Sequence, residues 1–383
     1  MSNVKCQIKK YPLLPYSQLV FDLLKTNPDV YWSCLGVRLD KQKVDVERLK
    51  QAVEKAIRNH PVFSMRVDES GMQQYEPQSD MLHTQYCSVD FGENGQWVDV
   101  YLSLNRIVGD GQSDSLIIGD IMRAYCHLPL EYDDYLNYLQ RVEQEKQSLR
   151  YEQNRQWLES EYGQLSCLVH PKTDLPIDIA DIPVEGVHIE DYTPLRTALN
   201  QLAEKRLFSM TAFFSLASAL AMMEYNESNE AALTWAYEGR ERPEEQHIVG
   251  SLHRDIPFKV NLPSPLPIVK ADLICQARKQ IRAGIAHSAY PFTLTKPHTG
   301  IWNYALNVLV QPSMQKRMLD LPFPFELIEP QEMKHPAYSL LDVEVYDEEQ
   351  LTVIYRYSAT HYQEESILKF AALVRKYAEW LLE

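Results

Sequence analysis

The chain has 383 residues, of which 45% are hydrophobic and 24% charged, and its formal net charge is −15. This length suits one large domain or two lobes that each hold a core, and the composition is that of a globular protein. The acidic balance argues against a nucleic-acid partner, because binding a polyanion needs concentrated positive charge.

The N-terminal part alternates between helical and strand patterns. A proline-bounded turn at 11–18 leads into a short amphipathic helix, and 32–39 has the composition of a strand. Asp45 can cap a following helix, on which apolar side chains recur every three or four positions until Pro61 ends the pattern. These patterns predict a mixture of helices and strands from the start of the chain.

The central stretch joins a strand to a helix through a short loop. Over 97–104 apolar residues alternate with other side chains, which is typical of a strand with one face on a core. Ser113 or Asp114 can cap the helix that follows, and two glycines indicate a turn with unusual backbone angles. Loops of this kind often carry active sites. The loop residues that could form one are Asn105, Arg106, Gly109, Asp110 and Gly111.

The second half contains a possible linker and further helices and strands. A polar stretch over 132–165 predicts one or two surface helices. Prolines and aspartates between 171 and 194 interrupt any periodicity, so we expect a linker there between an N-terminal lobe at 1–170 and a C-terminal lobe at 195–383. The remaining patterns predict helices at 195–207, 208–224, 271–286 and 367–381, and strands at 233–237, 306–310 and 351–357.

Motifs for several enzyme classes are absent from the sequence. It contains no Gly-x-Ser-x-Gly elbow, no His-Glu-x-x-His pair, no phosphate-binding glycine loop and no dinucleotide fingerprint. The six cysteines form no Cys-x-x-Cys pair, which argues against a zinc or redox site. There is no signal-peptide core and no apolar run of membrane length. We therefore expect a cytoplasmic protein with reduced thiols, no metal and no membrane partner.

Several short motifs resemble those of one enzyme family. Residues 105–111, Asn-Arg-Ile-Val-Gly-Asp-Gly, are similar to the His-His-x-x-x-Asp-Gly signature of nonribosomal peptide synthetase condensation domains, relatives of chloramphenicol acetyltransferase, although both histidines are replaced. The opening at 11–18 and the elements at 238–243 and 248–260 also resemble that family. The resemblance implies an α/β fold with two chloramphenicol acetyltransferase-like sandwich lobes, arranged as a V around a central channel that the signature loop lines.

The resemblance also implies roles for the loop residues. In the family the second histidine deprotonates or orients the attacking amine, and Arg106 holds that place. An arginine stays protonated and cannot be a general base. Asp110 is expected to be a structural anion with Arg240 as its partner and Arg106 as the rival, and such pairing would lower its pKa. The other signature positions are Asn105, Gly109 and Gly111.

The implied function is acyl transfer from a carrier-bound thioester to an amine, impaired or lost because the base is missing at Arg106. The main alternative is a noncatalytic module that docks carrier proteins or tailoring enzymes, and a third is an acyltransferase acting on an alcohol or another acceptor. No tightly bound cofactor is implied, because the phosphopantetheine arm of an acyl or peptidyl carrier protein would deliver the substrate. One predicted helix face is either an ordinary solvated face or a docking surface for such an acidic carrier. Its residues are Lys270, Arg278, Lys279 and Arg282.

Overall fold

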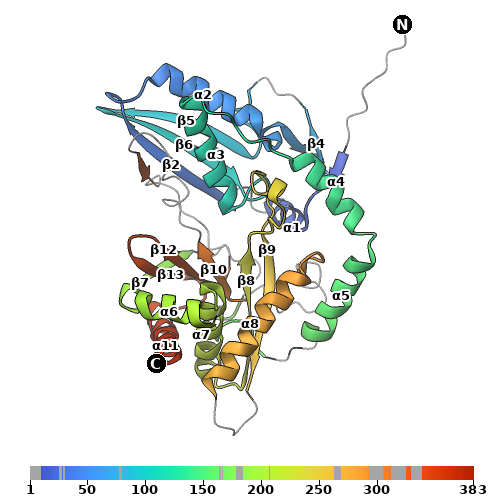
Figure 1. The fold of residues 1–383 in the computed structure, drawn as a ribbon, viewed down its shortest axis with the longest axis vertical. Coiled ribbons are helices and arrows are strands. Elements are labelled where there is room, and N and C mark those ends of the chain that lie inside the picture. The colour runs from blue at the N-terminus through green and yellow to red at the C-terminus, as the bar shows by residue number, and fades with distance from the viewer. Residues whose placement is uncertain are drawn as a thin grey trace. The chain divides into compact units, whose positions relative to one another are not determined.

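The chain divides into two compact units, and neither is continuous in sequence. The computed structural model describes residues 10–25, 28, 31–76, 80–163, 165, 167–177, 184–206, 208–262, 269–292, 305–311, 325–328 and 339–383. Unit 1 comprises Met1–Gln144, Glu238–His253 and Met314–His335, and unit 2 comprises Glu145–Tyr237, Arg254–Ser313 and Pro336–Glu383. Each unit combines helices with β-sheet (Figure 1), so the expected α/β class is confirmed.

Unit 1 contains two antiparallel sheets. The four-stranded sheet has the order β11-β2-β6-β5, and the three-stranded sheet has the order β1-β4-β3. The strands are β1 (Lys10–Pro12), β2 (Trp32–Asp40), β3 (Met65–Val67), β4 (Met72–Tyr75), β5 (Cys87–Asn94), β6 (Trp97–Asn105) and β11 (Glu326–Ile328). The helices are α1 (Pro15–Leu24), α2 (Val46–Asn59), α3 (Gly111–Tyr125) and α4 (Tyr135–Glu145), with 3-10 turns η1 (Pro61–Ser64) and η3 (Pro243–Glu245).

The predicted strand at 97–104 is confirmed as β6, which leads directly into the signature loop. It lies between β2 and β5, and its residues Val98, Val100, Leu102 and Leu104 are buried in the core of unit 1. At the far edge of this sheet, β11 adds a strand from much later in the chain. A Cβ on Gly36 of β2 would lie 2.6 Å from Cγ1 of Ile328, so this strand pairing needs glycine at position 36.

Two helices show how the local sequence sets helix starts in unit 1. The Asp45 carboxylate accepts a hydrogen bond from the Arg48 N–H at 3.1 Å, so the expected cap of α2 is confirmed. The caps expected for α3 are wrong, because Asp110 is its N-cap and the helix begins at Gly111. The aspartate of the signature is thus also the residue that starts the helix.

Unit 2 is built on one six-stranded sheet with the order β7-β13-β12-β10-β8-β9, in which β10 runs parallel to both of its neighbours. The strands are β7 (Glu185–Asp191), β8 (Glu230–Tyr237), β9 (Arg254–Asn261), β10 (Asn307–Gln311), β12 (Leu341–Asp347) and β13 (Leu351–Ser358). The helices are α5 (Leu149–Tyr162), α6 (Arg196–Arg206), α7 (Met210–Tyr225), α8 (Lys270–Ala286) and α11 (Glu364–Leu382), with the 3-10 turn η2 (Thr193–Leu195).

The core of unit 2 forms around α7, as the all-round apolar sequence of this helix predicts. Every residue from Ala212 to Met223 is buried, and the same core includes side chains of α8, α11 and the sheet. Among the described residues, no single helix is long and apolar enough to cross a membrane. Within the same part of the chain, one sharply bent pair, 193–205 with α7, meets that test by length and composition.

The expected linker at 171–194 contains regular structure. Residues Glu185–Asp191 form β7, which pairs with β13 at the edge of the sheet, while 178–183 lie outside the described residues. The strand is hard to recognise because its apolar residues Val187 and Ile189 are exposed and so mark no core face. The two units also divide the chain differently from lobes at 1–170 and 195–383, because Glu238–His253 groups with unit 1.

Candidate functional site

Asp110 lies at the junction of β6 and α3, where a capping box holds its side chain. Oδ1 accepts from the Ser113 N–H at 3.0 Å, and the Ser113 Oγ accepts from the Asp110 N–H at 3.2 Å. The start of a helix also favours a negative charge, because the unpaired N–H groups and the helix dipole point toward it. The capping box therefore fixes the position of this carboxylate, and the start of the helix favours its ionised form.

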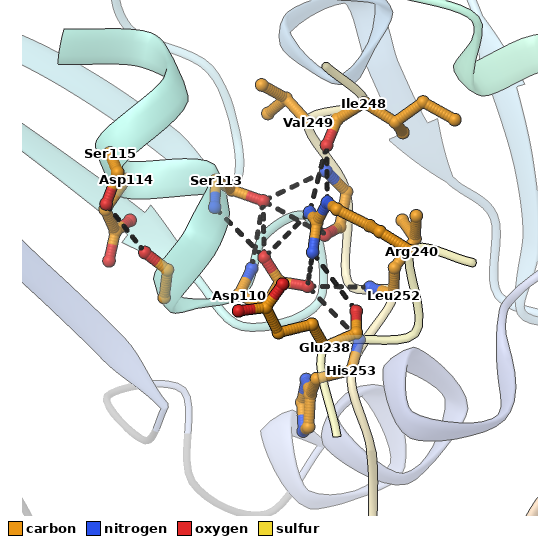
Figure 2. A network of polar contacts seen from close by, with 12 residues as sticks. Asp110, Ser113, Asp114, Ser115, Glu238, Arg240, Ile248, Val249, Leu252 and His253 are labelled. Atoms are coloured by element: carbon orange, nitrogen blue, oxygen red, sulfur yellow. Dashed lines mark hydrogen bonds and ion pairs between the residues drawn. The ribbon is translucent and has the colours of Figure 1, made fainter. Parts of the chain in front are cut away.

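Arg240 forms a bidentate ion pair with Asp110, as Figure 2 shows. Nη1 donates to Oδ2 and Nη2 donates to Oδ1, both at 3.0 Å, and the arginine side chain is fully buried. The backbone N–H groups of Leu252 and His253 donate to Oδ2 at 3.0 and 3.1 Å. Both carboxylate oxygens are thus surrounded by donors, and the Glu238–His253 segment is tied to the signature loop.

The pKa of Asp110 follows from this setting. Burial acts to raise it, but the charge and the hydrogen bonds of Arg240 outweigh burial and lower the pKa to about 2. A carboxyl group with so low a pKa is a poor proton acceptor at neutral pH. The geometry therefore assigns Asp110 to holding the loop together and not to moving a proton.

Gly250 lies where the 238–253 segment passes close to α3. Its N–H donates to the Ser113 Oγ at 3.0 Å. A Cβ on Gly250 would lie 2.6 Å from Cε2 of Tyr135 and 2.7 Å from Cδ1 of Leu252, and both of these side chains are buried. The close approach of the two segments therefore needs glycine at this position.

We expect Gly250→Ala to lower the free energy of unfolding by about 1–3 kcal/mol, because the added methyl group overpacks a buried site. Urea denaturation followed by circular dichroism would measure the change. Gly119→Ala is the matched control: it lies in α3 with no atom within 4 Å of an added Cβ, so we expect it to be neutral or slightly stabilising. Equal stability of the two variants would contradict this account of Gly250.

Arg106, at the place of the second signature histidine, pairs with Asp114 in the first turn of α3. Its Nη1 lies 3.2 Å from Oδ2, and the two side chains are 22% and 11% exposed. Burial raises the pKa of Asp114, and the charge of Arg106 opposes that rise. Arg106 is thus not the partner of Asp110, and a neighbouring carboxylate compensates its charge.

Asn105 is buried and shapes the start of the loop. Its N–H donates to the carbonyl of Tyr86 at 2.9 Å, and its Oδ1 accepts from the Ile107 N–H at 3.1 Å. A side-chain amide is neutral and is not a proton acceptor at ordinary pH. The position of the first signature histidine is therefore filled by a structural residue.

The expectation of unusual backbone angles at Gly109 and Gly111 is wrong. Neither has a positive φ, whereas Gly239, which precedes Arg240, has a φ of 70°. Gly109 instead permits close packing, because a Cβ there would lie 3.2 Å from Cδ1 of Leu104 and 3.2 Å from Cβ of Ser113. At this site the glycine with left-handed backbone angles is therefore Gly239, in the 238–253 segment that carries Arg240.

His253 lies at this site, although no sequence motif assigns it a role. Its backbone N–H donates to Asp110, and its ring packs edge-on against Tyr16 of α1 with the centroids 4.0 Å apart. The neighbouring Ser17 hydroxyl donates to the carbonyl of Ile107 at 2.8 Å, so α1 is itself attached to the signature loop. In the sequence, the one indication of a role for His253 is that it lies in the 248–260 element, which resembles a motif of the family.

The expected basic face of α8 is only partly available. Lys270 is half-buried and lies 4.9 Å from the ring centroid of Trp380, and Arg278 is also half-buried. Lys279 and Arg282 are exposed. In the described parts of the chain, no group of three His, Cys, Asp or Glu side chains could hold a metal ion.

Each unit combines sheets and helices, and in unit 1 an aspartate and an arginine join the strand-loop-helix signature to the 238–253 segment. This is a two-unit α/β fold with a condensation-type signature loop. The family model described as Condensation domain matches residues 85–382. The chain therefore belongs to the condensation domain family, which confirms the resemblance seen in the sequence. No curated protein sequence matches the chain.

Solved structures share this fold over almost the whole chain. The condensation domain from monacolin K polyketide synthase MokA matches with a TM-score of 0.80 at 12% identity, covering 98% of each chain. The epimerization domain from the third module of tyrocidine synthetase B matches with a TM-score of 0.78 at 15% identity, covering 98% of this chain and 96% of that one. A mutant starter condensation domain of rhizomide synthetase RzmA, in complex with C8-CoA, matches with a TM-score of 0.75 at 15% identity, covering 98% and 94%.

Proposed function

We propose that this chain is a condensation-type domain that binds acyl groups delivered as thioesters on the phosphopantetheine arm of a carrier protein, with their transfer to an amine slowed or lost. The observation that carries the proposal is the ion pair of Arg106 with Asp114 at the place of the catalytic histidine. Family membership supports the substrate class, and the C8-CoA complex of a structural relative is an acyl thioester of the same chemical kind.

The proton balance of the reaction explains why transfer is slowed. When an amine attacks the thioester carbonyl, a C–N bond forms, the C–S bond breaks and the thiolate leaves. The attacking nitrogen must then lose a proton. In the signature loop, Arg106 is already protonated, Asn105 is an amide and Asp110 is held ionised by Arg240. None of these three side chains is suited to take the proton.

The magnitudes indicate how much activity such a site could keep. A positioned general base contributes about 10² to 10⁴ in rate, whereas holding two reactants in attack geometry can lower a barrier by roughly 7–11 kcal/mol. A domain that still gathers both substrates can therefore keep slow transfer without its base. A domain that gathers only one of them would act as a docking module, which is our second candidate.

A direct assay separates these functions. The wild type and Arg106→Ala would be incubated with acyl-loaded and amine-loaded carrier proteins. Carrier binding would be measured by isothermal titration calorimetry, and product by intact mass spectrometry of the carriers. We expect carrier binding with product no faster than in Arg106→Ala. Faster product from the wild type would contradict the loss of catalysis, and its abolition in His253→Gln would assign proton acceptance to that imidazole. Failure to bind any loaded carrier would contradict the proposed function itself.

The docking surface for the carrier is a separate part of the proposal. Lys279 and Arg282 of α8 are exposed cations on a chain whose net charge is −15. A local positive face would attract an acidic carrier that the rest of the surface repels. The binding measured in the same assay should therefore weaken as salt is raised, because salt screens exposed charges.

A further inference from the structure

His60 lies between two carboxylates inside unit 1. It is the residue that ends α2, and it is 1% exposed. Its Nδ1 lies 2.8 Å from Oδ2 of Asp133, whose side chain is fully buried, and its Nε2 lies 3.3 Å from Oδ2 of Asp120 in α3. These two carboxylates are the charged groups that face the ring from the surrounding described elements.

This arrangement favours a charged imidazole ring. An ionised carboxylate only accepts hydrogen bonds, so Nδ1, which is hydrogen-bonded to Asp133, must carry a proton. A second proton on Nε2 would place positive charge 3.3 Å from the Asp120 carboxylate. Burial acts to lower the pKa of His60, but the nearby carboxylates of Asp120 and Asp133 outweigh it, and the pKa is raised. A neutral ring with its proton on Nδ1 would leave Nε2 as a lone pair facing the partly exposed carboxylate of Asp120.

The same carboxylate also holds the segment that carries Arg240. Asp133 Oδ2 accepts from the Val249 N–H at 3.2 Å, and Oδ1 accepts from the Tyr135 N–H at 3.0 Å. On one side of Val249, the carbonyl of Ile248 accepts from Nη2 of Arg240 at 2.9 Å. On the other side, the N–H of Gly250 bonds to Ser113. Val249 is therefore attached to Asp133 between two contacts to the signature site.

We propose that His60 is a positioning residue for the signature site, because its Nδ1 holds the Asp133 carboxylate where that group accepts from Val249, in the segment that presents Arg240 to Asp110. The Nε2 of His60 also contacts Asp120 in α3, the helix that begins after Asp110, and so helps to hold that helix in place. The importance of this role for acyl transfer rests on the proposed function, whereas the positioning itself does not.

The direction of the pH dependence follows from the raised pKa. A group whose pKa is raised on folding stabilises the fold fully below its unfolded pKa, and that stabilisation is lost as pH rises through the folded pKa. His60 should therefore hold the 248–253 segment at neutral pH and release it in alkaline solution. The loss should appear first at the Val249 amide, which contacts Asp133 directly.

Two measurements on the full chain test this proposal without any activity assay. NMR titration of the wild type should show both ring nitrogens of His60 protonated at neutral pH, with a midpoint above the ordinary value of about 6.5. Hydrogen exchange at Val249, Leu252 and His253, corrected for the intrinsic rate, should lose about tenfold or more in protection as pH rises through the midpoint that the NMR titration measures. A midpoint at or below the ordinary value would overturn the proposal.

Three variants separate positioning by charge from ordinary packing. Asp120→Asn should move the midpoint of the exchange transition to lower pH, and His60→Gln should remove the transition. His83→Gln is the matched control, because His83 also contacts two carboxylates, Asp80 and Asp90, but its side chain is 53% exposed. It should leave the transition unchanged. An unmoved midpoint in Asp120→Asn, or an equal loss of protection at every pH in His60→Gln, would refute the role of the charge.

Discussion

Asp110→Ala should lower the free energy of unfolding by about 3–5 kcal/mol, because it leaves the guanidinium of Arg240 buried without its counter-charge. The arginine side chain has no exposed surface, so water cannot replace the carboxylate. The backbone N–H groups of Leu252 and His253 would lose their acceptor as well. Urea denaturation followed by circular dichroism would measure the loss.

The control for Asp110 is an ion pair on the surface. Asp22 and Lys25 lie 2.6 Å apart with side chains 53% exposed, so Asp22→Ala should cost less than about 1 kcal/mol. The double variant of Asp110→Ala and Arg240→Ala should lose less than the sum of the two single variants, because the interaction is removed only once. Additive losses, or a small loss in Asp110→Ala, would show that the pair does not hold the site.

The ion pair of Asp110 with Arg240 should also make the stability of the protein depend on pH in acid. Arg240 lowers the pKa of Asp110 to about 2, below its value in the unfolded chain. A group with a lowered pKa contributes stability that is present above the unfolded pKa, about 4, and is lost as pH falls through the folded pKa. Wild type should therefore lose stability over that window, and the loss should be smaller in Asp110→Ala.

Arg106→His should raise the rate of acyl transfer by about 10² to 10⁴ over the wild type, which is the usual contribution of a positioned base. The new imidazole would face Asp114, which lies beside Arg106. That carboxylate would raise the pKa of the imidazole, so the rate should increase with pH as the ring loses its proton. Intact mass of loaded carrier proteins, followed over time at several pH values, would measure the gain.

Two further variants show whether the gain comes from the base. Arg106→Lys keeps a positive charge next to Asp114 but adds no base at neutral pH. Arg106→Ala removes the positive charge and also adds no base. Neither should match Arg106→His. If all three variants behave alike, the missing base is not what limits transfer, and the docking function becomes the better account of this chain.

Much of the secondary structure followed from local patterns. The alternation at 97–104 predicted β6, the spacing of apolar residues after Asp45 predicted α2, and the all-apolar stretch at 208–224 predicted α7. These patterns work because burying one face, or all faces, of an element leaves a fixed period in the sequence. Several other strands escaped this reasoning. Among them, β7 exposes its apolar residues, and β11 is only three residues long.

The sequence by itself determined the family, through the spacing of the signature at 105–111, and it determined that neither position 105 nor position 106 is a histidine. Only the tertiary structure decided the partners of these residues. It placed Arg240 on Asp110 and Arg106 on Asp114, it brought His253 to the same site, and it enclosed His60 between two aspartates. The physical reason is that a charged side chain carries no periodic signal. Its partner is chosen by burial and geometry once segments distant in sequence have packed together.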